Sequence, residues 1–103
     1  LGQFEGKIYV IDQPDHVEEA VDFVEDQRII GFDTETKPSF RKGQFNHVSL
    51  LQLSTSEQAF LFRLHQVGFP PPLRNLLEKE NLVKVGAAVH DDLKALRKLS
   101  DSF

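Results

Sequence analysis

Ile29-Ile30-Gly31-Phe32-Asp33-Thr34-Glu35-Thr36 joins a short apolar run to two carboxylates and decides the fold class. A nearly continuous apolar run such as residues 29–32 predicts a strand that is buried on both faces. The two acids follow the run, so we expect them at or near the carboxyl end of that strand. Residues two apart in a strand point to the same face, with Cα atoms roughly 6–7 Å apart. Asp33 and Glu35 therefore project together at a sheet edge where α/β proteins bind ligands.

Two neighbouring carboxylates repel each other unless a cation or a shared proton lies between them. Hard oxygen ligands suit Mg²⁺ or Mn²⁺, so Asp33 and Glu35 are candidate metal ligands. The alternative is that Asp33 starts an Asx turn and that Glu35 is solvated, because a bare Asp-x-Glu pattern is short and common. The position directly after Ile-Ile-Gly-Phe favours the metal hypothesis.

A third carboxylate strengthens this hypothesis. The run Val85-Gly86-Ala87-Ala88-Val89-His90-Asp91-Asp92 leads from a predicted strand into a predicted helix. A carboxylate at this junction can face the same sheet edge as Asp33. The alternative is that Asp91 or Asp92 caps the helix or complements its dipole.

The rest of the chain alternates strands and helices. We expect strands at residues 7–11, 29–32, 48–53, 59–64 and 82–88, with 48–53 and 59–64 forming a hairpin and 37–46 forming a loop. We expect three helices, one starting at Pro14, one after the prolines at 70–72, and one opened by Asp91 or Asp92. Their apolar faces recur at helical spacing: Val17, Ala20, Val21 and Val24; Leu73, Leu76 and Leu77; Leu93, Leu96 and Leu99. This order predicts an α/β fold with a mixed sheet and flanking helices.

Composition narrows the class of protein. A chain of 103 residues is one small domain or a piece of one, and no apolar run reaches the length of a membrane span. The absence of Cys excludes disulfides, thiolate metal sites and a Cys nucleophile, and fits a cytoplasmic or other intracellular, reducing compartment. The net charge of −4 argues against a charge-driven nucleic-acid coat. An enzyme acting on phosphodiesters can still be acidic, because bound cations supply local positive charge.

Three stretches, taken in order, carry a resemblance to a known family. Residues 30–35, Ile-Gly-Phe-Asp-Thr-Glu, are similar to the first motif of the DEDD superfamily of 3′→5′ exonucleases. Residues 48–53, Val-Ser-Leu-Leu-Gln-Leu, are similar to the strand that follows it in the branch of ribonuclease D and the Werner-syndrome exonuclease domain. Residues 85–93 resemble the second motif, whose essential Asp falls on Asp92.

The resemblance implies a ribonuclease H-like mixed sheet and two-metal hydrolysis of phosphodiester bonds, with two Mg²⁺ or Mn²⁺ ions about 3.5–4 Å apart. Asp33 would bind both ions, Glu35 would bind one, and Asp92 would act through an intervening water. The family's third motif, with a fourth acid and a Tyr or His, has no counterpart here. We therefore expect residues 1–103 to be the front portion of a 3′-5′ exonuclease domain, with its C-terminal part missing. Such a fragment should bind metal weakly and have little or no activity alone.

The implied substrate is the single-stranded 3′ end of DNA or RNA. Thr34 and Thr36 flank the acids and are candidate nucleotide contacts, although strand propensity and turn bonding explain them equally well. Phe40 and Phe45, in the basic loop with Lys37, Arg41 and Lys42, could stack on a base. A loop anchored by buried Phe is the favoured interpretation of that segment. The oligomeric state stays open.

Two other functions compete with the exonuclease. A phosphatase of the haloacid type would use Asp33 as its nucleophile, but Glu35 is longer than the usual acid and the strand order differs. A degenerate nuclease fold would act only as a nucleic-acid-binding or interaction module. The presence of Asp33, Glu35 and Asp92 argues against such decay.

Overall fold

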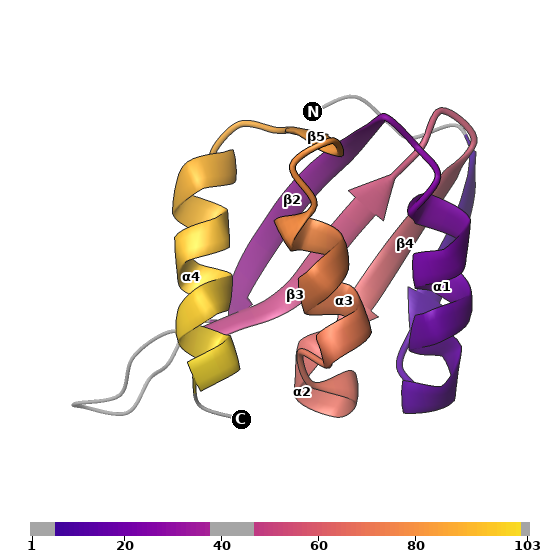
Figure 1. Cartoon of the computed structure of the whole chain (residues 1–103). Coiled ribbons are helices and arrows are strands. Elements are labelled where there is room, and N and C mark those ends of the chain that lie inside the picture. The colour runs from indigo at the N-terminus through magenta and orange to yellow at the C-terminus, as the bar shows by residue number, and fades with distance from the viewer. Residues whose placement is uncertain (1–5, 38–46, 102–103) are drawn as a thin grey trace.

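A five-stranded mixed sheet forms one of the two layers of the computed structural model, which describes residues 6–37 and 47–101 (Figure 1). Its strands are β1 (Lys7–Ile11), β2 (Ile29–Lys37), β3 (His47–Ser54), β4 (Gln58–Arg63) and β5 (Val83–Val85), in the order β1-β4-β3-β2-β5. The central strand β3 is antiparallel to both of its neighbours, β2 and β4, whereas β1 pairs in parallel with β4 and β5 pairs in parallel with β2. The predicted mixed sheet and the β3–β4 hairpin are confirmed.

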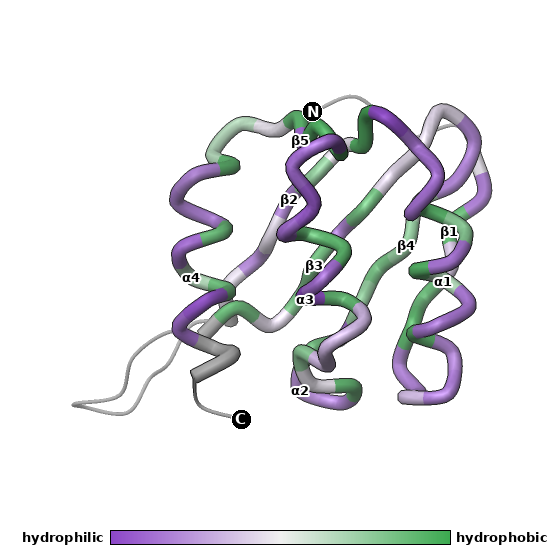
Figure 2. The backbone as a smooth tube through the Cα atoms, in the orientation of Figure 1, coloured by the Kyte–Doolittle hydropathy of each residue, from purple (hydrophilic) through white to green (hydrophobic). Residues whose placement is uncertain are grey.

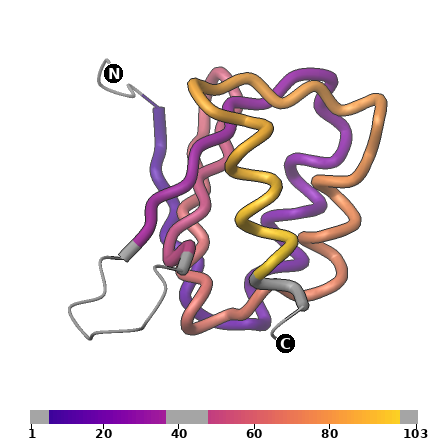
Figure 3. The backbone as a smooth tube through the Cα atoms, turned by 90° about the vertical axis from the view of Figure 1, so that its left-hand side faces the viewer, coloured from indigo at the N-terminus to yellow at the C-terminus, as the bar shows by residue number. Residues whose placement is uncertain are grey.

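The helices pack on one face of this sheet, as Figure 3 shows edge-on. After a 3₁₀ turn at Pro14–His16 come α1 (Val17–Val24), α2 (Leu64–Val67), α3 (Pro71–Glu78) and α4 (Val89–Asp101). Proline lies at the start of both the 3₁₀ turn and α3. Backbone N–H groups at a helix start have no hydrogen-bond partner within the helix, so the N–H that proline lacks is not missed there. Apolar and polar residues alternate along α1, α3 and α4 (Figure 2). No helix within the described ranges is long and apolar enough to cross a membrane.

The core lies between the sheet and these helices. Ile30 and Phe32 of β2 point into it, together with Leu51 and Leu53 of β3. The helices contribute the apolar positions predicted from their spacing, and the buried ones are Val17, Ala20, Val21, Val24, Leu73, Leu76, Leu77 and Leu96. A single layer of helices on a single sheet face therefore holds the fold together.

The opposite sheet face is not covered by any described helix. Ile29 is 60% exposed, Val83 51% and Val85 56%, and all three point to this face. The prediction that β2 is buried on both faces is therefore wrong. Burial on both faces requires helices on both sides of the sheet, and the described elements supply them on one side only.

Several boundaries differ from the prediction. Strand β2 continues to Lys37, so Asp33 and Glu35 lie within the strand rather than at its carboxyl end, because pairing with β3 extends past the apolar run. Strand β5 is limited to three residues, and α4 begins at Val89, before either predicted cap. The short helix α2 had no sequence signal. Most of the predicted loop, including Phe40 and Phe45, lies outside the described residues.

Candidate active site

The two acids of the first motif lie side by side on the uncovered face. Asp33 pairs with Gln52 of β3, and Glu35 pairs with Leu50. Side chains alternate between the two faces along a strand. Phe32 is buried under the helices, so its neighbour Asp33, and Glu35 two residues further on, point to the opposite face. Asp33 is half-buried and Glu35 is exposed. The predicted pairing of the two carboxylates on one face is confirmed.

A local hydrogen bond holds the Asp33 carboxylate against the backbone. The Thr34 backbone N–H donates to Oδ1 of Asp33 at 2.9 Å. Because Asp33 lies in a paired strand and its bond runs to the next residue, it does not start the Asx turn that was the alternative. A second free lone-pair direction on the same carboxylate can still accept a donor or a cation.

A β-bulge follows Glu35. The register shifts between Glu35 and Thr36, so that Ser49 is the extra residue on β3. The Ser49 hydroxyl donates to the Glu35 backbone carbonyl at 3.3 Å. Bulges bend a strand and re-aim its side chains, and they are frequent next to active sites. Asp33 and Glu35 precede the shift and keep a regular register with β3, and the irregularity begins at Thr36.

The second motif is brought against the first by a close backbone approach at Gly86. A Cβ atom at this position would collide with the carbonyl oxygen of Phe32, the residue directly before Asp33. Glycine therefore lets the β5–α4 connection pass against β2. Helix α4 then packs on β2 and β3, with Asp91 exposed and Asp92 half-buried in its first turn. Acidic residues in this turn also complement the helix dipole.

The carboxylates suit a hard divalent cation in their chemistry, because both Asp33 and Glu35 offer ionisable oxygens on one face. Within residues 6–37 and 47–101, however, no three His, Cys, Asp or Glu side chains are grouped closely enough to hold a metal ion. Asp92 lies in the first turn of α4, and within these ranges it does not form such a group with Asp33 and Glu35. The three-acid site stays a prediction. Asp33 and Glu35 fit a metal ion only as two carboxylate ligands of a larger site.

The remaining predicted contacts separate from the acids. Thr34 pairs with Leu51 and points to the helix side, whereas Thr36 follows the bulge and is exposed. Their nucleotide-binding role stays a prediction. The sequence analysis missed Gln52, which lies directly across from Asp33. A single amide inside the apolar run Val48–Leu53 was the signal that could have identified it.

Comparisons with known proteins agree with the fold. The family model described as 3′-5′ exonuclease matches residues 8–101. The mouse bifunctional 3′-5′ exonuclease/ATP-dependent helicase WRN (Mus musculus) is 33% identical over 69 residues, which are 65% of this chain and 5% of that protein. Two solved structures superpose closely. The Aedes aegypti Nibbler EXO domain has a TM-score of 0.79 at 25% identity, covering 93% of this chain and 45% of that one.

The second solved structure is the EXD2 exonuclease domain soaked in Mg and GMP, with a TM-score of 0.75 at 25% identity. The match covers 90% of this chain and 51% of that one. The fold is therefore the ribonuclease H-like exonuclease fold, and the chain belongs to the 3′-5′ exonuclease family. The chain spans 5–17% of the length of the curated relatives it matches, and about half of each solved domain.

Proposed function

We propose that this chain carries part of the catalytic centre of a divalent-metal-dependent 3′-5′ exonuclease, with Asp33, Glu35 and Asp92 as its acids. The observation that carries the proposal is the placement of two carboxylates on one face of β2, directly beside the backbone that Gly86 brings against Phe32. Membership of the 3′-5′ exonuclease family supports the reaction class.

Asp33 and Glu35 are the residues that would hold a metal. Mg²⁺ or Mn²⁺, present as two ions in a complete site, would activate water and stabilise charge on the leaving oxygen. The half-buried Asp33 is held by the Thr34 N–H, so its carboxylate keeps a fixed direction. Glu35 is exposed beside the bulge, so it could contact a terminal nucleotide as well. Of the family's solved structures, the EXD2 exonuclease domain was soaked in Mg and GMP.

The resemblance to the DEDD exonucleases implies a fourth acid, and residues 6–37 and 47–101 do not bring one to Asp33 and Glu35. The acids lie on the uncovered face, among exposed apolar side chains such as Ile29, Val83 and Val85. An apolar sheet face of this kind is stabilised by packing against a further element. We place the missing acid on such an element. The 103-residue chain alone should then bind metal weakly and hydrolyse little or nothing.

The proposed substrate is the single-stranded 3′ end of a nucleic acid. The chain is acidic overall, so cations rather than basic side chains must offset the phosphate charge near Asp33. A 3′-5′ exonuclease releases the labelled mononucleotide at once from a 3′-labelled oligonucleotide, but from a 5′-labelled one only after nearly the whole strand is digested. Parallel DNA and RNA substrates would establish which sugar is accepted.

The test compares the extended protein with matched variants in Mg²⁺. We expect Asp33→Ala and Asp92→Ala to lower the rate at least about 100-fold, because each loss removes several kcal/mol of transition-state stabilisation. Asp91→Ala is the control, since this neighbouring acid is exposed and has no assigned role. Equal rates for the parent and the Asp33→Ala protein would reject catalysis at this site. Nucleic-acid binding without hydrolysis would instead support a degenerate binding module.

A further inference from the structure

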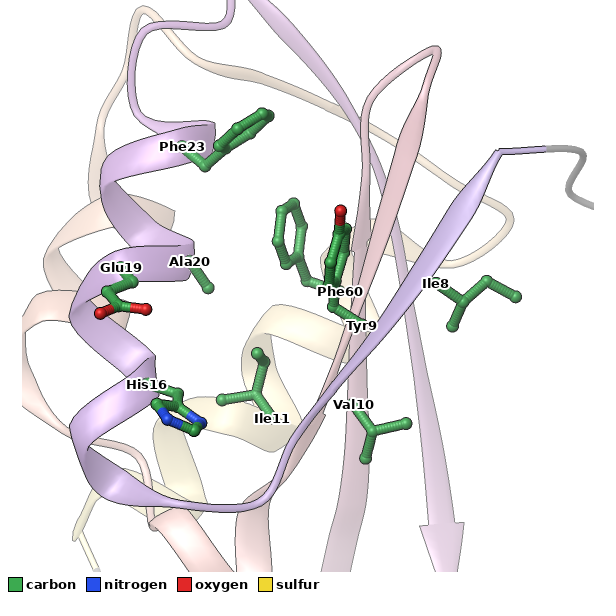
Figure 4. Close-up of a pocket in the computed structure, with 9 residues that line it drawn as sticks. All are labelled: Ile8, Tyr9, Val10, Ile11, His16, Glu19, Ala20, Phe23 and Phe60. Carbon is green, nitrogen blue, oxygen red and sulfur yellow. The ribbon is translucent and has the colours of Figure 1, made fainter.

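An aromatic pocket lies at the far edge of the sheet from β5, between β1 and α1 (Figure 4). Its volume is about 500 Å³. Tyr9 stacks on Phe60 with ring centroids 5.4 Å apart, and Phe23 of α1 approaches the same Phe60 ring at 5.7 Å. Phe60 is buried, whereas Tyr9 is 42% and Phe23 52% exposed. Two aromatic rings are thus presented to solvent around a third that anchors them.

The same pocket borders an open strand edge. Within the described residues, β1 is the terminal strand and pairs only with β4. The Lys7 N–H donates to the Glu57 carbonyl at 3.0 Å, so the backbone groups of Lys7 face β4. Because these groups alternate sides along a strand, those of Ile8 and Val10 point away from β4. Each offers one donor and one acceptor to an added strand.

The side chains of β1 suit a strand partner on both faces. Figure 4 shows Tyr9 and Ile11 pointing toward α1, whereas Ile8 and Val10 point to the other side of the sheet. Ile8 is 55% exposed and Val10 47%. A long, flat, apolar edge is normally blunted by charges, proline or a covering element. Here the only such device within β1 itself is Lys7 at its first position, and residues 8–11 continue as the uncharged, proline-free run Ile-Tyr-Val-Ile.

Charge around this edge selects the kind of partner. Residues 8–27 contain no Lys or Arg and are rich in acids, among them Asp12, Asp15 and Glu19. Glu19 lines the pocket itself, and all three side chains are exposed. A nucleic-acid backbone would be repelled by this surface, and a second copy of the chain would bring two acidic rims together. A basic partner is attracted.

We infer that the β1–α1 edge binds an extended, basic-flanked apolar segment of another protein by strand addition. The partner's backbone would bond to Ile8 and Val10, and a large apolar side chain would enter the pocket beside Tyr9 and Phe23. Main-chain bonds provide affinity in this mode of recognition, and side-chain pockets provide specificity. The site lies at the opposite sheet edge from β5, so the inference does not depend on the proposed nuclease activity.

A labelled peptide, Lys-Lys-Thr-Val-Phe-Val-Thr-Lys-Lys, serves as the probe, with fluorescence anisotropy as the readout. Its central Phe matches the pocket, and its valines would meet Ile8 and Val10 on the other face. We expect saturable binding by the chain. A peptide with every Lys replaced by Glu should bind at least several-fold more weakly, because the acidic rim then repels it.

Paired variants separate the three features of the site. Val10→Pro removes one outward N–H without touching the β4 pairing and should weaken binding about two- to tenfold, whereas Val10→Ala keeps that N–H. Phe23→Ala should weaken peptide binding by a similar factor, with Ile29→Ala as the exposed apolar control at the other side of the sheet.

The charge of the pocket rim is tested separately. Glu19→Lys should weaken peptide binding more than Glu78→Lys, which changes an exposed acid of α3. Circular dichroism checks that each variant is folded.

Several results would overturn the inference. The inference fails if the Lys-flanked peptide shows no saturable binding at concentrations up to roughly 1 mM. Binding that survives both Val10→Pro and Phe23→Ala would place the peptide elsewhere. Concentration-dependent dimerisation lost in Val10→Pro would assign the edge to a second copy of the chain. Displacement of the peptide by a mononucleotide, retained in Glu19→Lys, would assign the pocket to a base.

Discussion

The two faces of the sheet carry similar apolar side chains but differ in what covers them. On one face, Ile30 and Phe32 lie under the helices and are 1% and 3% exposed. On the other, Ile29 and Val85 are 60% and 56% exposed. The neighbours Ile29 and Ile30 of β2 thus fall on opposite faces, and Val85 of the adjacent strand β5 lies on the same face as Ile29. The covered face thus accounts for the stability of the chain, and the uncovered face carries its candidate chemistry.

The difference explains where the acids can lie. A carboxylate buried under the helices would have to leave water without a partner, at a large cost in free energy. Asp33 and Glu35 avoid that cost because they lie on the open face, where water and the polar side chains of Gln52 and Ser54 are near. The acids and the exposed apolar residues form one continuous surface of β2 and β5. A further element packed on this surface would shield the acids from bulk water and complete the site at the same time.

The largest expected effect compares adjacent isoleucines of β2. Ile30→Ala should lower the free energy of unfolding by about 2–5 kcal/mol, because it leaves a cavity under the helices. Ile29→Ala should change it by less than about 1 kcal/mol, because that side chain is already exposed to water. Urea denaturation followed by circular dichroism measures both. Similar losses for the two variants would mean that the second face is covered in this chain as well.

A second comparison concerns Gly31, which lies within β2, and Gly86, which packs against β2 from the β5–α4 connection. Gly86→Ala places a methyl group against the Phe32 backbone carbonyl, which cannot move without disturbing β2, so we expect a loss of about 1–3 kcal/mol. Gly31→Ala meets the Ser54 hydroxyl, a short side chain that can rotate away, so its cost should be smaller. The same denaturation experiment ranks them. A larger loss for Gly31→Ala would contradict the close approach of α4 to the first motif.

The smallest expected effect concerns Lys84 on the helix side of β5. Burial lowers the pKa of its ammonium below the ordinary 10.5. The unfolded chain then binds more protons than the folded chain between the two pKa values, so stability rises with pH in that window. Lys84→Met should remove this rise, whereas Lys94→Met, at an exposed position of α4, should keep it. Unfolding curves collected from neutral pH to 10.5 would show the difference, and parallel pH profiles would count against it.

Much of this fold could be predicted from the sequence because its signals are local. The apolar spacing of residues 17–24 and 73–77 identified the buried helix faces, and the prolines marked two helix starts. The alternation around Asp33 and Glu35 placed both acids on one face. The match of residues 8–101 to the 3′-5′ exonuclease family agrees with the motifs that suggested it.

The failures concern properties that depend on distant parts of the chain. An apolar run such as residues 29–32 shows that a strand is apolar, but not whether helices lie on one or both of its faces. The extension of β2 to Lys37 comes from pairing with β3, and the bulge at Glu35 comes from an extra residue on that partner strand. Gln52 was missed for the same reason, since its position across from Asp33 is set by the register. Strand register joins residues far apart in sequence, and composition does not encode it.

The most direct test of the central claim is where a metal ion binds. Nuclear magnetic resonance of the 103-residue chain with substoichiometric Mn²⁺ reports binding even when it is weak, because nearby amide signals broaden. We predict that broadening begins around Asp33 to Thr36 and the first turn of α4, and that Asp33→Ala removes it whereas Asp22→Ala on the acidic helix α1 does not. Broadening confined to residues 12–26, or unchanged in Asp33→Ala, would contradict a metal site at the first motif.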